Sequence, residues 1–335
     1  MRQAAISVVF VATMVLGTAD RAPAATPGTW QSVGSMSVGR HSPLPVRLLD
    51  GRVLIAGGWD GGFTGGTLAE ADIFNPATDL WSPAAPMSIP RQAACATILK
   101  DGRVIVIGGG TPQGVVATTE IYDPVSGSWT SAASMKTPRF SATATLLPDG
   151  KVLVVGGGND LSPFGLDTAE IYEPDSNAWI ETPAMAFAHS NHSAILMQDG
   201  RVIVVAGFTL DSAGDPQADA AAEIFDPASG YWSSAGSLSV GRINQGAALM
   251  QDGRVMVAGG DGGGYLSSVE IYDPVQNAWS LGAPMSSPRN GISLLTLTNG
   301  EVLVVGGIVS PVSSPQPPRR TTRKPIHGHR QAVLK

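Results

Sequence analysis

Hydrophobic and polar positions along this chain follow one pattern that recurs about every 50 residues. In one copy, the run from Ser141 to Leu147 has strand character and is followed by the tight turn Pro148-Asp149-Gly150, after which Val152 to Val155 is apolar throughout. Asp-Gly between two apolar runs is typical of a β-hairpin. An uninterrupted apolar run of this length is typical of a strand buried on both faces.

The second half of the copy predicts two more strands. Gly156-Gly157 ends the buried run, Ala169 to Tyr172 is the next strand, and a turn leads to a strand around Trp179. We name the four strands A to D in chain order. They make a sheet with two faces to cover, and neighbouring copies can cover both when the sheets stack around an axis.

A ladder of single residues marks the copies. Each has a tryptophan, an apolar residue six positions later, a basic residue four positions after that, and finally an Asp-Gly or Asn-Gly turn. The tryptophans are Trp81, Trp129, Trp179, Trp232 and Trp279. A further ladder starts the chain, from Trp30 through Met36 to Arg40. A fixed period near 50 residues is typical of a repeat protein.

The copies differ in length at one place. Successive tryptophans lie 47 to 53 residues apart, and 9 to 15 residues separate the paired glycines from the acid of strand C. The two numbers differ by 38 in every copy, so the B–C loop holds all the variation. Because A and B form a hairpin, the B–C loops and the D–A connections are predicted on one face, named here the loop face, with the Asp-Gly turns on the opposite turn face. Variable loops on a rigid scaffold favour ligand binding at the loop face.

These features resemble the kelch repeat family over residues 26–307. The resemblance depends on the paired glycines, on the acid-aliphatic-aromatic motif of strand C, as in Glu120-Ile121-Tyr122, and on the ladder; the fourth copy departs from it with Ala206-Gly207. It implies an all-β, kelch-type β-propeller. Five copies are complete and a sixth has strands A and B only. We therefore expect six blades, with the incomplete last blade closed by the N-terminal strand, residues 26–38.

Three groups of residues on the loop face are candidate ligand contacts. A basic ring either fixes the D–A connections by hydrogen bonds or contacts acidic ligands, as matching arginines do in kelch domains that bind peptides. Aromatic side chains of the B–C loops either bind a ligand or pack beneath their own loops. Polar residues at the start of strand A are predicted to line the channel mouth. The candidates are Arg40, Arg91, Arg139, His189, Arg242 and Arg289; Trp59, Phe164 and Tyr265; and Asn191 and Asn244, beside Ser42, Ser141 and Gln245.

The loop acids and histidines have no metal-site spacing. Asp60, Asp160, Asp211 and Asp261 either solvate turns or bind a cation, and His189 and His192, three apart on a strand, point to opposite sides. Galactose oxidase carries a copper site on a kelch propeller, and that site needs a cysteine linked to a tyrosine, a second tyrosine and two histidines. Cys95, the one cysteine here, is predicted to be a buried apolar residue. We expect no cofactor and no metal.

The ends of the chain differ from the repeats. Met1-Arg2, the apolar run from Ala4 to Ala19 and Ala22-Pro23-Ala24 predict a secretory signal peptide over residues 1–24, and the alternative is an uncleaved membrane anchor. The propeller is expected over 25–307, and 308–335 is a Pro/Ser-rich basic tail that is either disordered or the product of a truncated reading frame. Excluding the six cations after Glu301 leaves 15 cations against 27 acids, which argues against nucleic-acid binding.

The sequence therefore favours a secreted monomer, extracellular or periplasmic, that binds a protein or a glycan through its loop face. The alternatives are a propeller enzyme that acts on carbohydrate, of the oxidase, lyase or epimerase class, and an inactive truncated paralogue. Fold alone does not separate these classes.

Overall fold

The structure is a computed structural model that describes residues 34–61, 66–211 and 213–309, and these residues form strands and loops without a helix. No helix long and apolar enough to cross a membrane occurs in these ranges. Five four-stranded antiparallel sheets follow one another along the chain. Their strands are β1 (Leu44–Arg47), β2 (Val53–Ala56), β3 (Ala71–Asn75) and β4 (Leu80–Ala84); β5 (Cys95–Ile98), β6 (Val104–Ile107), β9 (Thr119–Asp123) and β10 (Ser128–Ala132); β11 (Thr143–Leu146), β12 (Val152–Val155), β13 (Ala169–Glu173) and β14 (Ala178–Glu181); β15 (Ser193–Leu196), β16 (Val202–Leu210), β17 (Pro216–Asp226) and β18 (Tyr231–Ser237); and β19 (Gly246–Leu249), β20 (Val255–Ala258), β21 (Val269–Asp273) and β22 (Ala278–Leu281).

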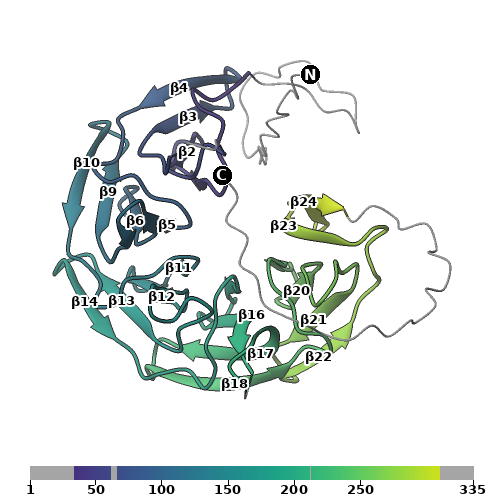
Figure 1. Cartoon of the computed structure of the whole chain (residues 1–335). Coiled ribbons are helices and arrows are strands. Elements are labelled where there is room, and N and C mark those ends of the chain that lie inside the picture. The colour runs from purple at the N-terminus through teal and green to yellow at the C-terminus, as the bar shows by residue number, and fades with distance from the viewer. Residues whose placement is uncertain (1–33, 62–65, 212, 310–335) are drawn as a thin grey trace, which may run out of the picture.

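Two smaller hairpins complete the described structure. The last hairpin consists of β23 (Arg289–Thr296) and β24 (Val302–Val309), and a short one of β7 (Gly110–Thr111) and β8 (Gly114–Val115) lies in the B–C loop of the second blade. The sheets are arranged around an axis, with the first strand of each sheet innermost and the fourth at the rim (Figure 1). The innermost strands pack side by side in chain order, from β1 against β5 to β19 against β23. This is the radial arrangement of a β-propeller, as the sequence predicted.

The recurring tryptophan joins neighbouring blades. Trp129 lies directly opposite Tyr122 across strands D and C, with ring centroids 5.0 Å apart, and its indole N–H donates to the carbonyl of Ala85 in the preceding connection at 2.7 Å. Trp179 and Trp279 make the same backbone bond to Ala133 and Ala235. A tryptophan at this place therefore buries its ring within one blade and ties that blade to the one before it.

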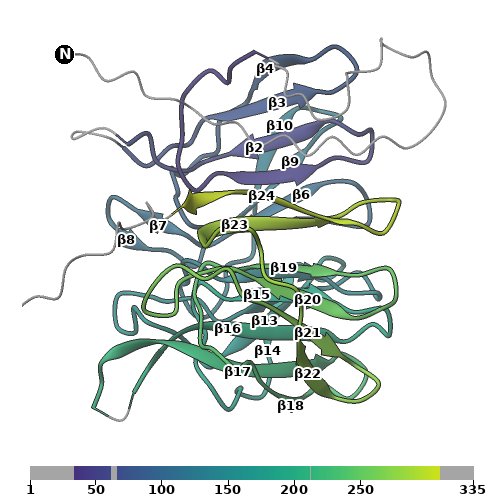
Figure 2. The same cartoon turned by 90° about the vertical axis from the view of Figure 1, so that its right-hand side faces the viewer.

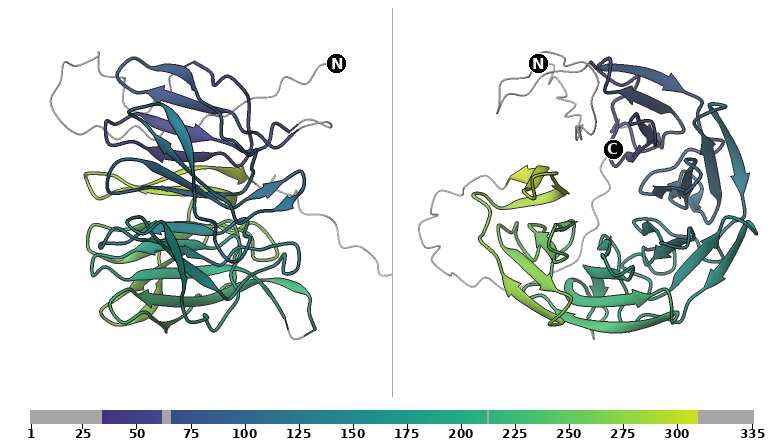
Figure 3. Two further views of the ribbon diagram at one scale, coloured as in Figure 1. Left: turned by 90° about the vertical axis from the view of Figure 1, so that its left-hand side faces the viewer. Right: turned by 180° about the vertical axis from the view of Figure 1, so that it is seen from behind.

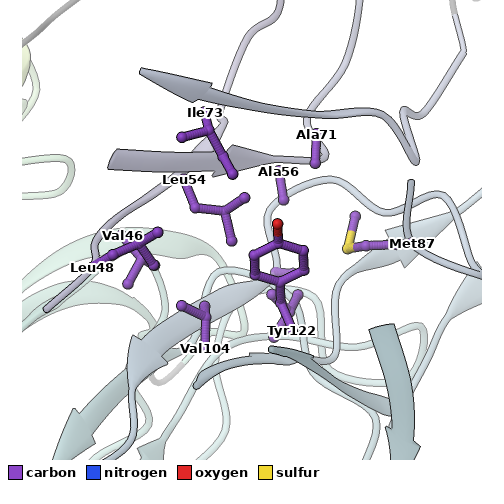
Figure 4. Packing of buried hydrophobic residues seen from close by; sticks show 11 residues of the cluster. Val46, Leu48, Leu54, Ala56, Ala71, Ile73, Met87, Val104 and Tyr122 are labelled. Carbon is purple, nitrogen blue, oxygen red and sulfur yellow. The ribbon is translucent and has the colours of Figure 1, made fainter. Parts of the chain in front are cut away.

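The hydrophobic core is divided into clusters between successive blades. In the first cluster, Leu54 and Ile73 of the first blade face Val104 and Tyr122 of the second, and Met87 of the connection belongs to the same cluster (Figure 4). Met135, Met185 and Leu238 are buried in the same way between later blades. The apolar residue six positions after each tryptophan therefore belongs to the D–A connection, and its side chain is buried between two neighbouring blades.

Several predicted boundaries need revision. In the fourth blade β16 runs on to Leu210 past a bulge at Ala206-Gly207, whereas the second strands of the other four complete blades end before their paired glycines. The last hairpin extends to Val309, past the boundary expected at 307. It lies opposite the first blade across the seam of the ring (Figure 3, right). The predicted outer strand around Trp30 lies outside the described residues, as do the signal peptide and the tail from residue 310.

The loop face exists as predicted. The start of each B–C loop pairs with the end of the preceding D–A connection through isolated bridges, such as His41 with Trp59 and Phe140 with Gly158. The Asp-Gly and Asn-Gly turns lie at the other end of the strands, and the turn between β23 and β24 is seen at the right of the edge view (Figure 2). Long loops and chain connections thus share one face, and the short turns occupy the other.

Candidate binding face

The basic ring lies inside the blades. Arg139 donates from Nη1 to the carbonyls of Gly156 at 2.9 Å and Thr168 at 2.7 Å, and from Nη2 to Glu170 Oε1 at 3.0 Å. The equivalent ion pairs are Arg40 with Asp72, Arg91 with Glu120, and Arg242 with Glu270, all with side chains at most 3% exposed. Burial lowers the pKa of these guanidinium groups, and the charge of the paired carboxylate opposes the shift. The geometry therefore supports the alternative in which the basic ring fixes the D–A connections by hydrogen bonds.

The same acid also holds the connection that enters its blade. Glu170 accepts the backbone N–H groups of Lys136 and Thr137 at 2.7 and 3.1 Å. Asp72 does so for Ser37, through both its N–H and its hydroxyl. The residues just before Arg40 therefore enter the first blade as the D–A connections enter the others.

The paired glycines are required because two backbones touch there. Gly109 N donates to the carbonyl of Arg139 in the next blade at 2.7 Å, and a Cβ on Gly108 would lie 2.4 Å from that oxygen. Gly108 also has a φ of +65°, which favours glycine. The paired glycines are thus a contact point between blades, and this contact is sufficient to explain why glycine occurs there.

His189 replaces the arginine in the fourth blade and is equally buried. Its Nδ1 lies 2.8 Å from the carbonyl of Ala206 and its Nε2 lies 3.4 Å from Glu223 Oε2. Burial alone would raise the pKa of Glu223. The hydrogen bonds from His189 and from the N–H groups of Ala186 and Phe187 outweigh burial and hold that pKa below its usual value.

Polar side chains do gather at the channel mouth. A shallow pocket of about 280 Å³ is lined by residues at or just before the start of five innermost strands, which are Ser42, Pro43, Leu44, Ala93, Ala94, Ser141, Ala142, Asn191, His192, Asn244 and Gln245. The predicted residues Asn191 and Asn244 are thereby brought together with Ser42, Ser141 and Gln245. The lining has no carboxylate and no lysine or arginine, so it presents neutral hydrogen-bonding groups and small apolar surface.

The residues two positions after each ring residue share a strained backbone. Ser42, Ala93, Ser141, Asn191 and Asn244 have φ between 48 and 53°, and Gly291 takes the same place in the last hairpin. The backbones from Ala93 to Gly291 form a belt. Ser141 N donates to Ala93 O, and further bonds run from Asn191 to Ser141, from Asn244 to Asn191, and from Gly291 to Asn244. Sequence reasoning missed this belt; the signal was the recurrence of Asn and Gly at one ladder position, since both tolerate positive φ.

His192 is the one ionisable side chain in the lining of this pocket. Its Nε2 lies 2.8 Å from the hydroxyl of Thr143, its Nδ1 has no hydrogen-bond partner, and burial followed by the charge of His189 lowers its pKa to about 3. The rings of His189 and His192 are 5.9 Å apart and tilted by 58°. His192 is therefore a neutral hydrogen-bonding group at physiological pH.

The loop aromatics are partly open to solvent but lie on separate blades. Trp59 is 37% exposed and stacks near His41, and Phe164 is 36% exposed with its edge against Phe208 of the next blade. Tyr265 is half-buried in the short loop of the fifth blade. Because these rings are only partly buried, the structure is consistent with both alternatives, ligand contact and packing beneath their own loops.

The acids of the B–C loops accept hydrogen bonds from backbone N–H groups of these loops. Asp261 accepts the N–H groups of Gly263 and Gly264, Asp211 those of Ala213 and Asp215, and Asp160 that of Val115 in the neighbouring loop. In the described part of the chain, no three His, Cys, Asp or Glu side chains lie together as metal ligands would. Cys95 is buried, as predicted, and burial raises the pKa of its thiol to about 12.

A larger hollow, about 410 Å³, lies on the turn face between the second and third blades. Several of its charged groups already have partners: Lys151 Nζ is 2.6 Å from Glu173, Asp101 is paired with Arg103, and Lys100 Nζ donates to the carbonyl of Pro148. As a candidate ligand site, the hollow on the turn face has the larger volume, whereas the channel mouth has polar side chains without hydrogen-bond partners. We give more weight to the free groups, because paired charges must be separated before they can bind a ligand.

Comparison with protein-family models matches this architecture. A model described as Kelch motif matches four stretches of the chain, which together cover more than half of it: residues 40–88, 93–136, 139–186 and 245–286.

Proposed function

The chain belongs to the kelch-repeat family, and from this premise we propose that it is a secreted binding module that holds a protein ligand on its loop face. Kelch repeats form protein-binding propellers, which sets the coarse function. The finer assignment, to the loop face and to a secreted protein, is the part proposed here. The signal-like segment of residues 1–24 supports secretion.

The observation that carries the proposal is the channel mouth. Asn191 and Asn244 offer amide donors and acceptors, Ser42 and Ser141 offer hydroxyls, and none of these four side chains has a hydrogen-bond partner in the described structure. Such groups match the N–H and C=O groups of an extended peptide. The surrounding rings, Trp59, Phe164 and Tyr265, supply apolar contact area on the same face.

A glycan is the second candidate. A neutral pocket of amides and hydroxyls beside a half-exposed tryptophan suits sugar hydroxyls and the apolar face of a pyranose ring. Carbohydrate-modifying activity would require acids with a free oxygen near the mouth. The strand C acids, such as Glu120 and Glu170, are held in ion pairs instead.

The test is a binding screen of the full chain against a library of secreted-protein peptides and a glycan array. For any binder, the triple change Trp59→Ala, Phe164→Ala and Tyr265→Ala is compared with Asn191→Ala and Asn244→Ala. Each aromatic anchor is expected to contribute about 2 kcal/mol to binding. Val125→Ala and Val275→Ala, at exposed turns away from the loop face, serve as controls and should leave affinity unchanged.

Thermal unfolding of the same variants separates binding from packing. Lower affinity at unchanged unfolding temperature supports the loop face as the ligand site. A lower unfolding temperature with full affinity would assign the rings to loop packing and would remove the proposal.

A further inference from the structure

The loop face of the third and fourth blades carries acids without cations. We name as the acidic patch the B–C loops of these blades and the connection between them, residues 156–168, 182–190, 206–211 and 213–221. These residues include five aspartates and neither lysine nor arginine. The aspartates are Asp160, Asp167, Asp211, Asp215 and Asp219. None of the five belongs to an ion pair of the described structure.

Three chain segments lie side by side in the acidic patch. Leu166 pairs with His189, and Ser190 pairs with Phe208, through isolated bridges. The rings of Phe164 and Phe208 meet edge-on across the two blades, with centroids 6.1 Å apart. The two loops and the connection therefore form one surface, from which the β16–β17 hairpin extends on the loop face (Figure 2).

Large apolar side chains are exposed among these acids. Leu161 is 94% and Phe187 48% exposed, and Phe164 and Leu210 are exposed as well. The B–C loops of the second and fifth blades, which the structure describes in full, have no exposed large apolar side chain. A local gathering of exposed apolar side chains with charged residues around it is typical of an interaction surface.

The basic ring does not offset the negative charge of the patch. The side chains of Arg139 and Arg242 are at most 1% exposed, and each is paired with the acid of its own blade. Among the described residues of the B–C loops and D–A connections, Lys136 is the one exposed lysine or arginine, and its Nζ lies 2.7 Å from Glu181. The patch therefore attracts cations, whereas a face of open arginines would attract acids.

Asp219 has a carboxylate oxygen without a partner. Its Oδ1 accepts the N–H of Ala220 at 2.7 Å, while its Oδ2 is shielded from water and has no hydrogen-bond partner in the described structure. Asp219 lies opposite Gly207 in the β16–β17 hairpin, directly before Phe208 of the patch. A carboxylate that is partly removed from water is stabilised by a cation that comes close to it.

We propose that the acidic patch is the contact surface for a basic and apolar polypeptide segment, in which lysine or arginine alternates with large apolar residues. Its cations lie near Asp160, Asp167 and Asp219, and its apolar side chains cover Leu161 and Phe187. Burial of apolar surface supplies the affinity, and charge complementarity selects the partner and speeds association. The inference rests on the proposed function, to which it adds the charge of the partner and the part of the loop face that it contacts.

The first test uses the full chain and a short fluorescent peptide of alternating lysine and leucine residues. Saturable binding is expected, and a peptide with glutamate in place of every lysine should bind at least about tenfold more weakly. Raising the ionic strength from about 0.01 M to about 1 M should weaken the binding of the lysine peptide, because the Debye length shortens from about 30 Å to about 3 Å. No saturable binding up to about 1 mM, or equal binding of the two peptides, would overturn the proposal.

Two variants with the same change in net charge assign the binding to the patch. The first combines three changes within the patch, which are Asp160→Asn, Asp167→Asn and Asp219→Asn. The control combines three changes at exposed acids of the turn face, which are Asp79→Asn, Asp149→Asn and Asp175→Asn. The amide oxygen still accepts the backbone hydrogen bonds of these positions, so both variants are expected to fold.

The patch variant should bind the lysine peptide about tenfold more weakly, and the turn-face control should bind it as tightly as the unchanged chain does. Equal weakening in both variants would show that net charge alone attracts the peptide, and would refute the site. If the patch variant does not fold, the lysine and glutamate peptides on the unchanged chain still decide whether the partner is basic.

The apolar part of the patch is tested by the double change Leu161→Ser and Phe187→Ser. Val125→Ser and Val275→Ser, at exposed turns of the turn face, are the matched control. The patch change should lower affinity for the lysine peptide at an unchanged unfolding temperature, because apolar contact area is lost. Unchanged affinity would mean that the peptide is held by charge alone, which contradicts the proposed contact.

A further variant tests the chain's own cations as the occupant of the patch. The six lysine and arginine residues after Glu301 are replaced by serine, and this variant should bind the lysine peptide as the unchanged chain does. Binding that requires these replacements would assign the patch to the chain's own C-terminal segment and remove the external partner.

Failure here is distinguishable from failure of the proposed function. If the lysine peptide does not bind while a ligand from the binding screen still requires Trp59 and Tyr265, the charge assigned to the partner is wrong and the loop face remains the binding face. If no screened ligand requires any residue of the loop face, both proposals are wrong.

Discussion

The guanidinium of Arg139 donates from Nη2 to Oε1 of Glu170 at 3.0 Å, and both side chains are only 1% exposed. Because Glu170 also accepts two backbone N–H groups of the incoming connection, one acid fixes the arginine and the chain that leads to it. The arginine–acid pair occurs in four complete blades, and in each of them the acid also accepts at least one backbone N–H of the incoming connection. The arginine and the acid of these pairs therefore fix each blade to the D–A connection that leads into it.

Breaking this pair should be costly. Glu170→Gln leaves the buried Arg139 without a counter-charge, and we expect the free energy of unfolding to fall by about 3 kcal/mol or more. The solvent-exposed pair of Asp252 and Arg254 is the control, and Asp252→Asn should lower it by about 1 kcal/mol at most. Urea denaturation measures both values; similar losses would contradict the structural role assigned to the ring.

The paired glycines should tolerate no side chain. Gly108→Ala would bring Cβ to 2.4 Å from the carbonyl of Arg139, in a backbone with φ of +65°. Gly127 has a similar φ of +68° with no atom within 4 Å, so Gly127→Ala isolates the backbone strain. We expect a loss of about 1 kcal/mol at Gly127 and clearly more at Gly108. Equal losses in denaturant titrations would show that the close contact contributes nothing.

Stability should decrease in mild acid because of His192. Its pKa in the folded protein is about 3, below the usual value of 6.5, so the unfolded chain binds a proton more readily between these two pH values. The contribution is fully present above pH 6.5 and should fall by about 2 kcal/mol by pH 5.

His192→Gln should flatten this part of the stability profile, and His41→Gln, at an exposed position, should not. Unfolding free energies of the three proteins from pH 7 to pH 4 give the comparison. A profile that is unchanged by His192→Gln would mean that other groups cause the acid sensitivity.

Cys95 should be unreactive in the folded protein. Its thiol is buried with a pKa of about 12, so the thiolate that attacks thiol reagents is scarce and shielded. A disulfide-based thiol reagent should label it only in denaturant. Val125→Cys, at a position that is 95% exposed, should be labelled at once in the native state and serves as the positive control. Rapid native labelling of Cys95 would indicate that its blade opens.

The sequence predicted the fold well because each signal was local. The Asp-Gly turns, the apolar runs and the paired glycines placed strands such as Val152–Val155 to the residue. The role of the ring was left open, because a basic residue at a fixed position is equally consistent with a buried ion pair and a surface contact. Only the distance from Arg139 to Glu170, residues 31 apart in the chain, separates the two.

The candidate site was predicted in part. Asn191 and Asn244 line a pocket at the start of the innermost strands, because the ladder fixes where strand A begins, and ligand contact by them stays a prediction. Among the described residues no carboxylate pairs with Arg289, and the sequence could not show this, because the partner depends on which strand pairs with β24. The long β16–β17 hairpin was not predicted, and Ala206 in place of a glycine does not by itself explain it, because β24 also runs on through its two glycines.

The belt of backbone bonds around the channel also gives the array a direction of unzipping. An interior blade contributes two links, one accepted and one donated, as Asn191 does with Ser141 and Asn244. The described belt ends at Ala93 on one side and at Gly291 on the other, and each of these ends has a single belt link. In a linear array of coupled units the end units detach first, so opening should proceed inward from both ends of the belt, and amide hydrogen exchange should be slowest in the blades around Asn191.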